Sequence, residues 1–238
     1  ISREYNQFIS GRLNDQNNVM GRETAKNSPL QELERVLNVD ENSLVSDIEG
    51  FFAAWHDLAQ NPGGSVERDR VLYEGDNLLS SFEQTKGELV KIRKNIDISL
   101  EAKVDEINVK FQEIAELNDR IAKEEGFGNI SNQNRDRRDI LIQDLSRILG
   151  IQSYQAGEGK VNVQLPGGIP LVQGNDAVVF EAGYSGATLS FQIKTGDLAV
   201  EVEKDNLGGE FRGSLDIRDD LIPSLDQDLD ELRYSLVT

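Results

Sequence analysis

The stretch FFAAWHDLAQNPGGSVERDRVL, residues 51–72, contains the end of one predicted helix and the start of the next. Apolar side chains recur along the first helix at spacings of 4, 3, 4 and 3, at Leu44, Ile48, Phe51, Trp55 and Leu58. This spacing predicts a helix, capped by Asn42 or Ser43, that buries one side against another helix. Residues 61–64, Asn-Pro-Gly-Gly, end it, because proline and glycine continue a helix only at a cost. We therefore predict that Phe51, Trp55 and Leu58 are structural packing residues.

A long helical pattern follows from Ser65 to Glu125. Its apolar residues fit two heptad registers, the second advanced by one residue. The first holds Val71, Leu78, Phe82, Leu89, Ile92 and Ile96, and the second Leu100, Val104, Ile107, Phe111, Ile114 and Ile121. The slip near residues 97–99 predicts a bend or a change of winding, and Asn118 in the second register can fix helix pairing. Ile107, Phe111 and Ile114 are predicted structural packing residues.

Three further helices are expected around this long one. One covers residues 2–26, and another starts at Ser28, where a capping serine precedes a proline at the first helical position. Past Gly126-Phe127-Gly128, a shorter helix is expected from about Asn132 to Leu149, with Gly150 as its C-terminal cap.

The apolar period changes to two over residues 151–205, where short alternating runs are separated by glycine-rich turns. This predicts about six antiparallel strands, after which helix returns from Ser214 and is kinked or restarted by Pro223. The expected fold class is α+β: an elongated antiparallel helical bundle with long helices and an inserted small antiparallel β domain. The expected divisions are a first part of the bundle at 1–150, the β domain at 151–207 and a helical return at 208–238.

Composition excludes several classes of partner and site. Of 238 residues, 43 are acidic and 25 basic, giving a net charge of −18 that opposes binding to nucleic acid or an anionic membrane. The absence of cysteine excludes disulfides, zinc–thiolate sites and cysteine nucleophiles. No apolar run approaches the roughly 20 residues of a membrane-spanning helix. Because the chain starts at Ile1 and ends inside a helical pattern, we expect an internal piece of a longer protein.

The sequence does not predict a catalytic or metal site. His56 and Asp57 are the best catalytic candidates, but adjacent residues on a helix point about 100° apart and do not form a histidine–carboxylate pair. His56 is therefore interpreted as a histidine that flanks the packed face. Residues 226–230 resemble the start of a calcium loop but lack its glycine and closing glutamate. We expect no enzyme activity, no metal and no cofactor.

Basic side chains cluster at two places in this acidic chain, at Arg68 and Arg70 and in the run from Arg135 to Asp139. One interpretation is exposed ion pairs on single helices, which contribute about 0.3–0.5 kcal/mol each. The other is that residues such as Arg138 and Asp139 hold the helices of one bundle together or meet an acidic neighbour. Both interpretations stay open from the sequence.

Several segments together resemble the family of bacterial flagellar hook-associated protein 1. The opening stretch matches that family in its doubled aromatic, tryptophan, leucine-alanine pair, proline and arginine, in this order. Residues 107–121 resemble its long helix and residues 134–151 its Arg-Asp helix, carried here by Arg138 and Asp139. Residues 160–174 resemble its β hairpin, and 208–232 its return into helix.

The resemblance implies a structural component of the hook–filament junction, a central fragment that lacks both terminal segments. It implies export without a cleaved signal to the extracellular flagellum, and partners among the hook protein, the second junction protein and copies of itself. An export chaperone would bind a missing terminal segment. The alternatives are another axial protein, such as a flagellin or the second junction protein, and a coiled-coil adaptor or binding protein.

Overall fold

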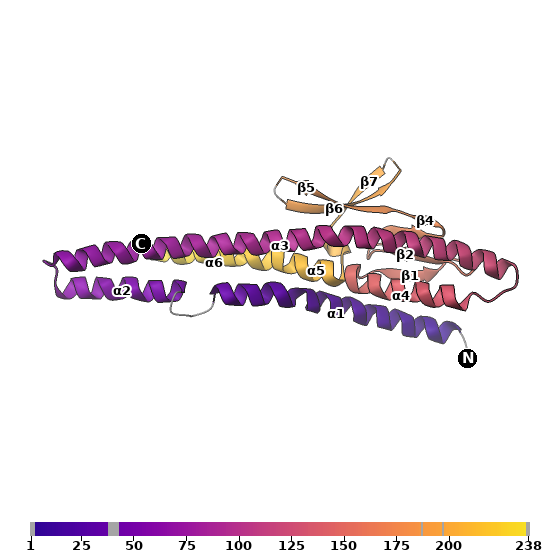
Figure 1. Cartoon of the computed structure of the whole chain (residues 1–238), viewed down its shortest axis with the longest axis horizontal. Helices are drawn as coiled ribbons and strands as arrows, with labels where there is room; N and C mark the ends of the chain where they lie inside the picture. The colour runs from indigo at the N-terminus through magenta and orange to yellow at the C-terminus, as the bar shows by residue number, and fades with distance from the viewer. Residues whose placement is uncertain (1–2, 38–42, 187, 197, 237–238) are drawn as a thin grey trace. The chain divides into compact units, whose positions relative to one another are not determined.

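The computed structural model describes residues 3–37, 43–186, 188–196 and 198–236, with side chains from residue 9 onward. Four α-helices precede a single β region and two follow it in the described chain (Figure 1). The helices are α1 (Arg3–Leu37), α2 (Leu44–Gln60), α3 (Ser65–Gly126), α4 (Asn132–Leu149), α5 (Gly209–Asp216) and α6 (Ile222–Ser235), with a π-helix (Ile217–Leu221) before α6. The strands are β1 (Gln152–Gln155), β2 (Val161–Gln164), β3 (Pro170–Gln173), β4 (Asp176–Ala177), β5 (Val179–Ser185), β6 (Thr188–Thr195) and β7 (Leu198–Val202). The expected α+β class is confirmed.

Local signals explain most helix ends. The Ser43 hydroxyl accepts a hydrogen bond from the Ser46 amide at 3.3 Å and caps α2, which ends before the Asn-Pro-Gly-Gly turn. Helix α3 is 62 residues long and continuous through the register slip. Gly150 ends α4 in the left-handed conformation at φ 67°.

The expected helix start at Ser28 is wrong, because α1 runs unbroken through Pro29. A proline inside a helix removes one main-chain hydrogen bond and crowds the preceding turn. The helix continues because packing holds it on both sides: Gly21 lies against Arg147 of α4, and Leu33 is buried. The returning helix also begins earlier than Ser214, at Gly209, and Pro223 lies in the first turn of α6.

The chain folds as two compact units. Unit 1 comprises Ile1–Asn27 and Ile96–Asp216, and unit 2 comprises Ser28–Asn95 and Ile217–Thr238. The strands therefore share a unit with α4, α5 and parts of α1 and α3, whereas the sequence suggested a division at residues 150 and 207. The buried face of the second sheet packs against helix α5 of the same unit.

Two antiparallel sheets lie in unit 1. The first has the order β1-β2-β3-β4 and the second β5-β6-β7, giving seven described strands where about six were expected. Phe180, Phe191 and Phe211 form an aromatic cluster, with ring centroids 5.1–5.8 Å apart, that joins the second sheet to α5. Ile107, Phe111 and Ile114 of α3 are fully buried in this unit.

Unit 2 contains α2, the first half of α3, the end of α1 and α6. Leu33, Ala54, Val71, Leu78, Phe82, Leu89, Ile92 and Leu229 are among its buried apolar side chains. Lys86 of α3 pairs with Asp226 at 3.2 Å and Asp230 at 2.7 Å on α6. Two of the three aspartates that resemble a calcium loop are therefore ion-pair partners of a lysine.

Trp55 departs from the expected burial, since 49% of its surface is exposed, while Phe51 and Leu58 are half-buried. Ala54, with no exposed surface, is the buried residue of α2. Gly50 lies near Glu74, and Gly75 of α3 lies beside the Phe51 ring. These small residues let α2 and α3 approach closely, so the contact face centres on Ala54 and Trp55 turns outward.

Candidate functional site

A buried polar cluster joins α3, α4 and the first sheet of unit 1. Arg138, only 1% exposed, donates from Nη1 to Asn118 Oδ1 at 2.8 Å and to the Gly159 carbonyl at 2.7 Å. Asn118, with no exposed surface, donates to the carbonyls of Val161 at 2.8 Å and Gly174 at 2.6 Å, and accepts from the Val161 amide at 3.0 Å. The sequence suggested that Asn118 can fix helix pairing; it bonds to Arg138 of the neighbouring helix α4 and also to strand backbone. This cluster fastens the sheet to the helices.

Arg138 and Asp139, adjacent in sequence, have different environments. Arg138 is inside the cluster, whereas Asp139 is exposed on a groove. The pKa of Asp139 is raised, first because nearby protein desolvates the carboxyl group and further by the charge of Asp136, while Arg138 opposes the shift. The structure therefore does not bring these two predicted residues together as an ion pair.

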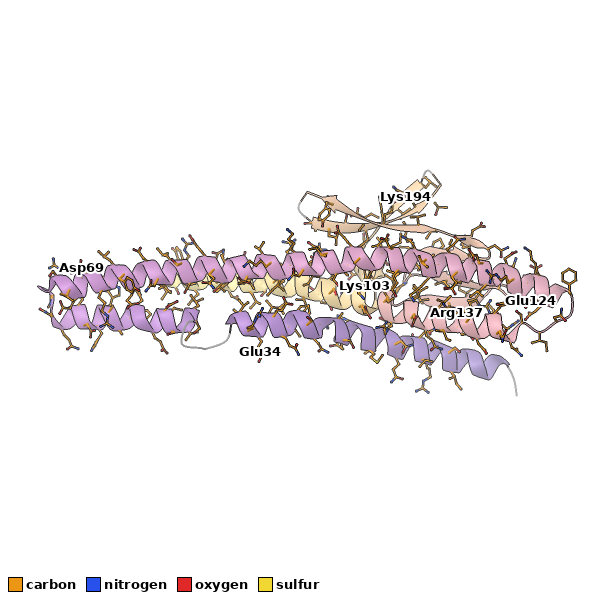
Figure 2. The ribbon with its side chains drawn as sticks, in the orientation of Figure 1. Glu34, Asp69, Lys103, Glu124, Arg137 and Lys194 are labelled. Atoms are coloured by element: carbon orange, nitrogen blue, oxygen red, sulfur yellow. The ribbon has the colours of Figure 1, made fainter. Side chains whose placement is uncertain are left out.

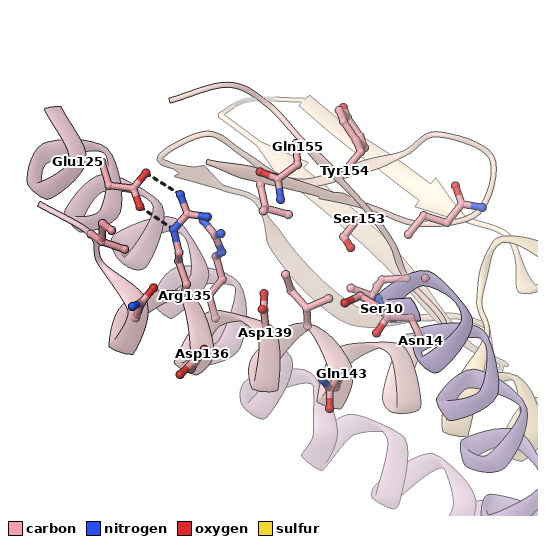
Figure 3. Close-up of a pocket in the computed structure, with 18 of the residues that line it drawn as sticks. Ser10, Asn14, Glu125, Arg135, Asp136, Asp139, Gln143, Ser153, Tyr154 and Gln155 are labelled. Carbon is pink, nitrogen blue, oxygen red and sulfur yellow. Dashed lines mark hydrogen bonds and ion pairs between the residues drawn. The ribbon is translucent and has the colours of Figure 1, made fainter. Parts of the chain in front are cut away.

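The groove beside Asp139 has a volume of about 990 Å³ and lies within unit 1 (Figure 3). Residues of α1, α4 and β1 form most of its lining, with the end of α3, the turn after it and Val161 of β2, and most of the lining residues are polar. They include Ser10, Asn14, Asp15, Asp136, Asp139, Gln143, Gln152, Ser153, Tyr154 and Gln155. At one end Arg135 forms two hydrogen bonds of 2.6 Å with Glu125, which occupies that guanidinium group. The sequence gave no sign of this groove, because its walls come from several segments that are separate in the sequence.

The other predicted residues hold the turn between α2 and α3. Arg70 pairs with Asp57 at 2.7 Å, and Arg68 donates to the Pro62 carbonyl at 2.8 Å. Asn61 donates to Glu67 at 2.9 Å, and this hydrogen bond lowers the pKa of Glu67. His56 is exposed, and its Nε2 lies 2.8 Å from the side-chain amide nitrogen of Gln60. Asp57 thus serves Arg70, and no histidine–carboxylate pair forms between these neighbours.

The outer face of α2 is apolar and open. It consists of Val45, Phe52 and Trp55, which are 39%, 55% and 49% exposed and lie on one side of the helix. The Phe51 ring contacts both outer aromatics, with centroids 6.0 Å from Phe52 and 6.2 Å from Trp55. Aromatic side chains held by a neighbouring ring present a large apolar area with little loss of side-chain freedom on binding.

A junction built from glycines connects α1, α4 and α5, and sequence reasoning missed it. Gly21 of α1 lies against the Arg147 carbonyl, and Gly213 of α5 against the Arg22 carbonyl. The Gly208 amide donates to the Leu149 carbonyl at 2.7 Å, and Asn18 accepts from the Gly209 amide at 2.6 Å. Gly21, a glycine inside the helix predicted at residues 2–26, was a signal, but the sequence does not show which backbones meet.

Asp216 lies beside this junction among four cations. It pairs with Arg22 at 2.7 Å, Arg212 at 3.0 Å, Lys204 at 3.6 Å and Lys26 at 3.7 Å. Burial acts to raise the pKa of Asp216, but the hydrogen bond from Arg22 and the charges of Arg22, Arg212 and Lys204 outweigh it, so the pKa is lowered.

We expect Asp216→Asn to destabilise the chain by about 1–3 kcal/mol at pH 7, because several charge-assisted hydrogen bonds are lost. A carboxyl group with a lowered native pKa stabilises above its unfolded pKa and loses that contribution as the pH falls through the native value. The difference between wild type and variant should therefore shrink below about pH 4 in urea unfolding. A constant difference from pH 7 to pH 3 would contradict this role for the charge.

No group of three or more His, Cys, Asp or Glu side chains in the described part of the chain could hold a metal ion. Among the same residues, no helix is long and apolar enough to cross a membrane. The described side chains thus offer polar packing clusters, a groove and an open apolar face.

Comparison with known proteins agrees with the structural features. Flagellar hook-associated protein 1 of Escherichia coli strain K12 is 28% identical over 243 residues, covering 99% of this chain and 43% of the relative. The protein of the same name from Bacillus subtilis strain 168 is 26% identical over 234 residues, covering 91% of this chain and 46% of the relative. The chain thus spans less than half the length of the curated relatives it matches.

The fold also matches a solved structure, that of the flagellar hook junction protein FlgK from Burkholderia pseudomallei. The TM-score is 0.78 at 23% sequence identity, over 87% of this chain and 39% of the other. Residues 30–238 match the family described as the flagellar hook-associated protein FlgK helical domain. The chain belongs to the family of the flagellar hook-associated protein FlgK helical domain.

Proposed function

We propose that this chain is part of a structural subunit that joins the hook to the filament of a bacterial flagellum and acts by packing against neighbouring subunits. Family membership supports this proposal, and the observation that carries it is the outer face of α2. An apolar helical face that the described part of the chain leaves open is typical of a surface that another protein covers. The role requires no catalytic group, metal or cofactor, and the subunit works outside the cell.

The proposed partners are the hook protein, the second junction protein and further copies of the subunit. An export chaperone would bind outside residues 1–238. The coiled-coil adaptor is less favoured, because Asn118, the polar residue that would specify a partner helix, is fully buried and bonds to strands of its own chain. A partner helix could not displace it without breaking the first sheet away from α3.

Deletion of the gene that encodes the chain tests the junction role. We expect cells with hooks but no filaments, and unpolymerised flagellin in the medium, because the filament has nothing to build on. Electron microscopy of detached flagella and an immunoblot of the medium measure both effects, and a plasmid copy of the gene should restore filaments. Intact filaments in the deletion strain would refute the proposal.

The outer face of α2 can be tested in the same strain by restoring the gene as Phe52→Ser/Trp55→Ser. We expect few filaments, because the two substitutions remove the apolar contact surface. Export should stay normal, because exposed residues can be replaced without unfolding the protein. Because Trp55 is half exposed, its replacement should lower the unfolding free energy by less than about 2 kcal/mol. Val90→Ser, at a residue of α3 that is 67% exposed, is the matched control and should assemble normally. Full assembly by the double variant would exclude this face as the contact.

A further inference from the structure

The free edge of the first sheet lies along the polar groove. Strand β1 is the edge strand of the order β1-β2-β3-β4, and residues 152–155 line the groove. Figure 3 shows Ser153 directed toward α4 and Tyr154 directed away from it. An edge strand presents unpaired main-chain groups that can accept a further strand.

The register identifies which main-chain groups are open. Val161 of β2 bonds to Asn118 through both its amide and its carbonyl, so Val161 and Gln155, its partner in β1, form a non-hydrogen-bonded pair. At the turn, the Ala156 amide donates to Lys160. Alternation along an antiparallel pair then directs the amide and carbonyl of Ser153 and Gln155 away from β2. No partner for these groups is found in the described part of the chain, whereas Asn118 satisfies the equivalent groups of Val161.

The wall facing this edge carries polar groups without partners. Asn14 is 8% exposed, and its Oδ1 is buried without a hydrogen bond among the described residues. A buried acceptor of this kind costs free energy until a donor reaches it. Asp15, Asp136 and Asp139 also line the groove, and no ion pair of theirs occurs within the described ranges. The guanidinium groups nearby are already engaged, Arg135 by Glu125 and Arg138 by Asn118. The groove therefore favours hydrogen-bond donors with positive charge.

We propose that this groove binds an extended polypeptide segment with basic side chains, which pairs with the main chain of β1 at Ser153 and Gln155 as an added strand. Side chains of Ser153 and Gln155 lie on the same face as buried Val161 and Val163, their partners in β2. Alternate side chains of the added strand would thus point toward α4 and α1. Lysine or arginine at those positions would meet Asp136, Asp139 and the Asn14 oxygen. Main-chain bonds would supply the affinity and the acidic wall the specificity.

A capped hexapeptide of alternating lysine and valine is the probe, titrated into the 238-residue chain and followed by amide NMR. We expect shift changes and slowed hydrogen exchange at Ser153 and Gln155. N-methylation of alternate peptide amides should weaken binding about tenfold when it blocks the paired edge and little when it blocks the other edge. Glutamate in place of lysine should weaken binding by about tenfold or more at low salt.

A pair of protein variants distinguishes the effect of the aspartates in the groove from the effect of the protein's net charge. Asp136→Asn/Asp139→Asn should weaken the lysine peptide about three- to tenfold, whereas Asp69→Asn/Asp76→Asn, which removes the same charge from α3, should change affinity less than about twofold. An equal loss of affinity in the two double variants would show that only net charge matters and would overturn the proposal. Equal affinity for peptides that are N-methylated on either edge, or on neither, would also overturn it. Protection of Ser153 and Gln155 in the peptide-free chain at high concentration would assign the edge to a second copy and would also overturn it.

Discussion

Gly21→Ala is expected to destabilise the chain by about 2–4 kcal/mol, as a clash inside a close-packed helix junction does. An added Cβ would overlap the Arg147 carbonyl and would lie 3.1 Å from Arg147 Cγ. The obstacle is backbone of α4, which cannot rotate away as a side chain can. Chemical denaturation followed by circular dichroism measures the loss.

Gly11→Ala is the matched control on the same helix. An added Cβ there meets nothing within 4 Å, so only the backbone effect remains. Alanine in an exposed helix interior stabilises by about 0.5–1 kcal/mol relative to glycine. The two substitutions are identical in chemistry and should therefore have opposite signs. If both were stabilising, α1 would not lie against α4 at Gly21.

Arg138→Ala is expected to cost about 3–5 kcal/mol, because it empties a buried site and strips hydrogen bonds from groups that water cannot reach. The Gly159 carbonyl and the Asn118 side chain both lose their bond to the guanidinium group. Since Asn118 holds strand backbone through the same amide, the first sheet should loosen as a unit. Amide exchange at Val161 should accelerate more than exchange in β6.

Arg137→Ala, at the residue directly before Arg138, is the control. Arg137 projects from α4 (Figure 2) and pairs with Glu113 at 2.7 Å, but more than half of its side chain is exposed. Surface ion pairs contribute roughly 0–1 kcal/mol, so the loss should stay below about 1 kcal/mol. Comparable losses for the two arginines would show that the buried cluster adds little to stability.

The periodic part of the fold could be predicted from the sequence. All twelve apolar residues of the two α3 registers are buried, including those on either side of the slip at residues 97–99. A long helix repeats the same local geometry, so the spacing alone identifies its inner face. The ends of α2, α3 and α4 followed from residues that cap or break helices locally.

The contacts between segments could not be predicted in this way. The face of α2 is rotated from Trp55 toward Ala54 because Gly50 and Gly75 allow close approach, and spacing does not record which helix lies opposite. In the sequence, Arg138 is indistinguishable from the other charged residues of the Arg-Asp run. Only its contacts with Asn118 and Gly159 show that it is a buried residue. The groove needs α1, α4 and β1 together, so its polar residues carry no joint pattern in the sequence.

The β region leaves and re-enters the helical part of unit 1 at one point. Leu149 ends α4, Gly208 precedes α5, and a hydrogen bond of 2.7 Å joins the two residues. Residues 150–207 therefore form a closed loop between α4 and α5, and the hydrogen bond between Leu149 and Gly208 fixes its two ends side by side. Segments attached through two adjacent points can gain or lose length without moving their host. We therefore expect insertions or deletions of whole hairpins between residues 150 and 207 to leave the glycine junction of α1, α4 and α5 unchanged.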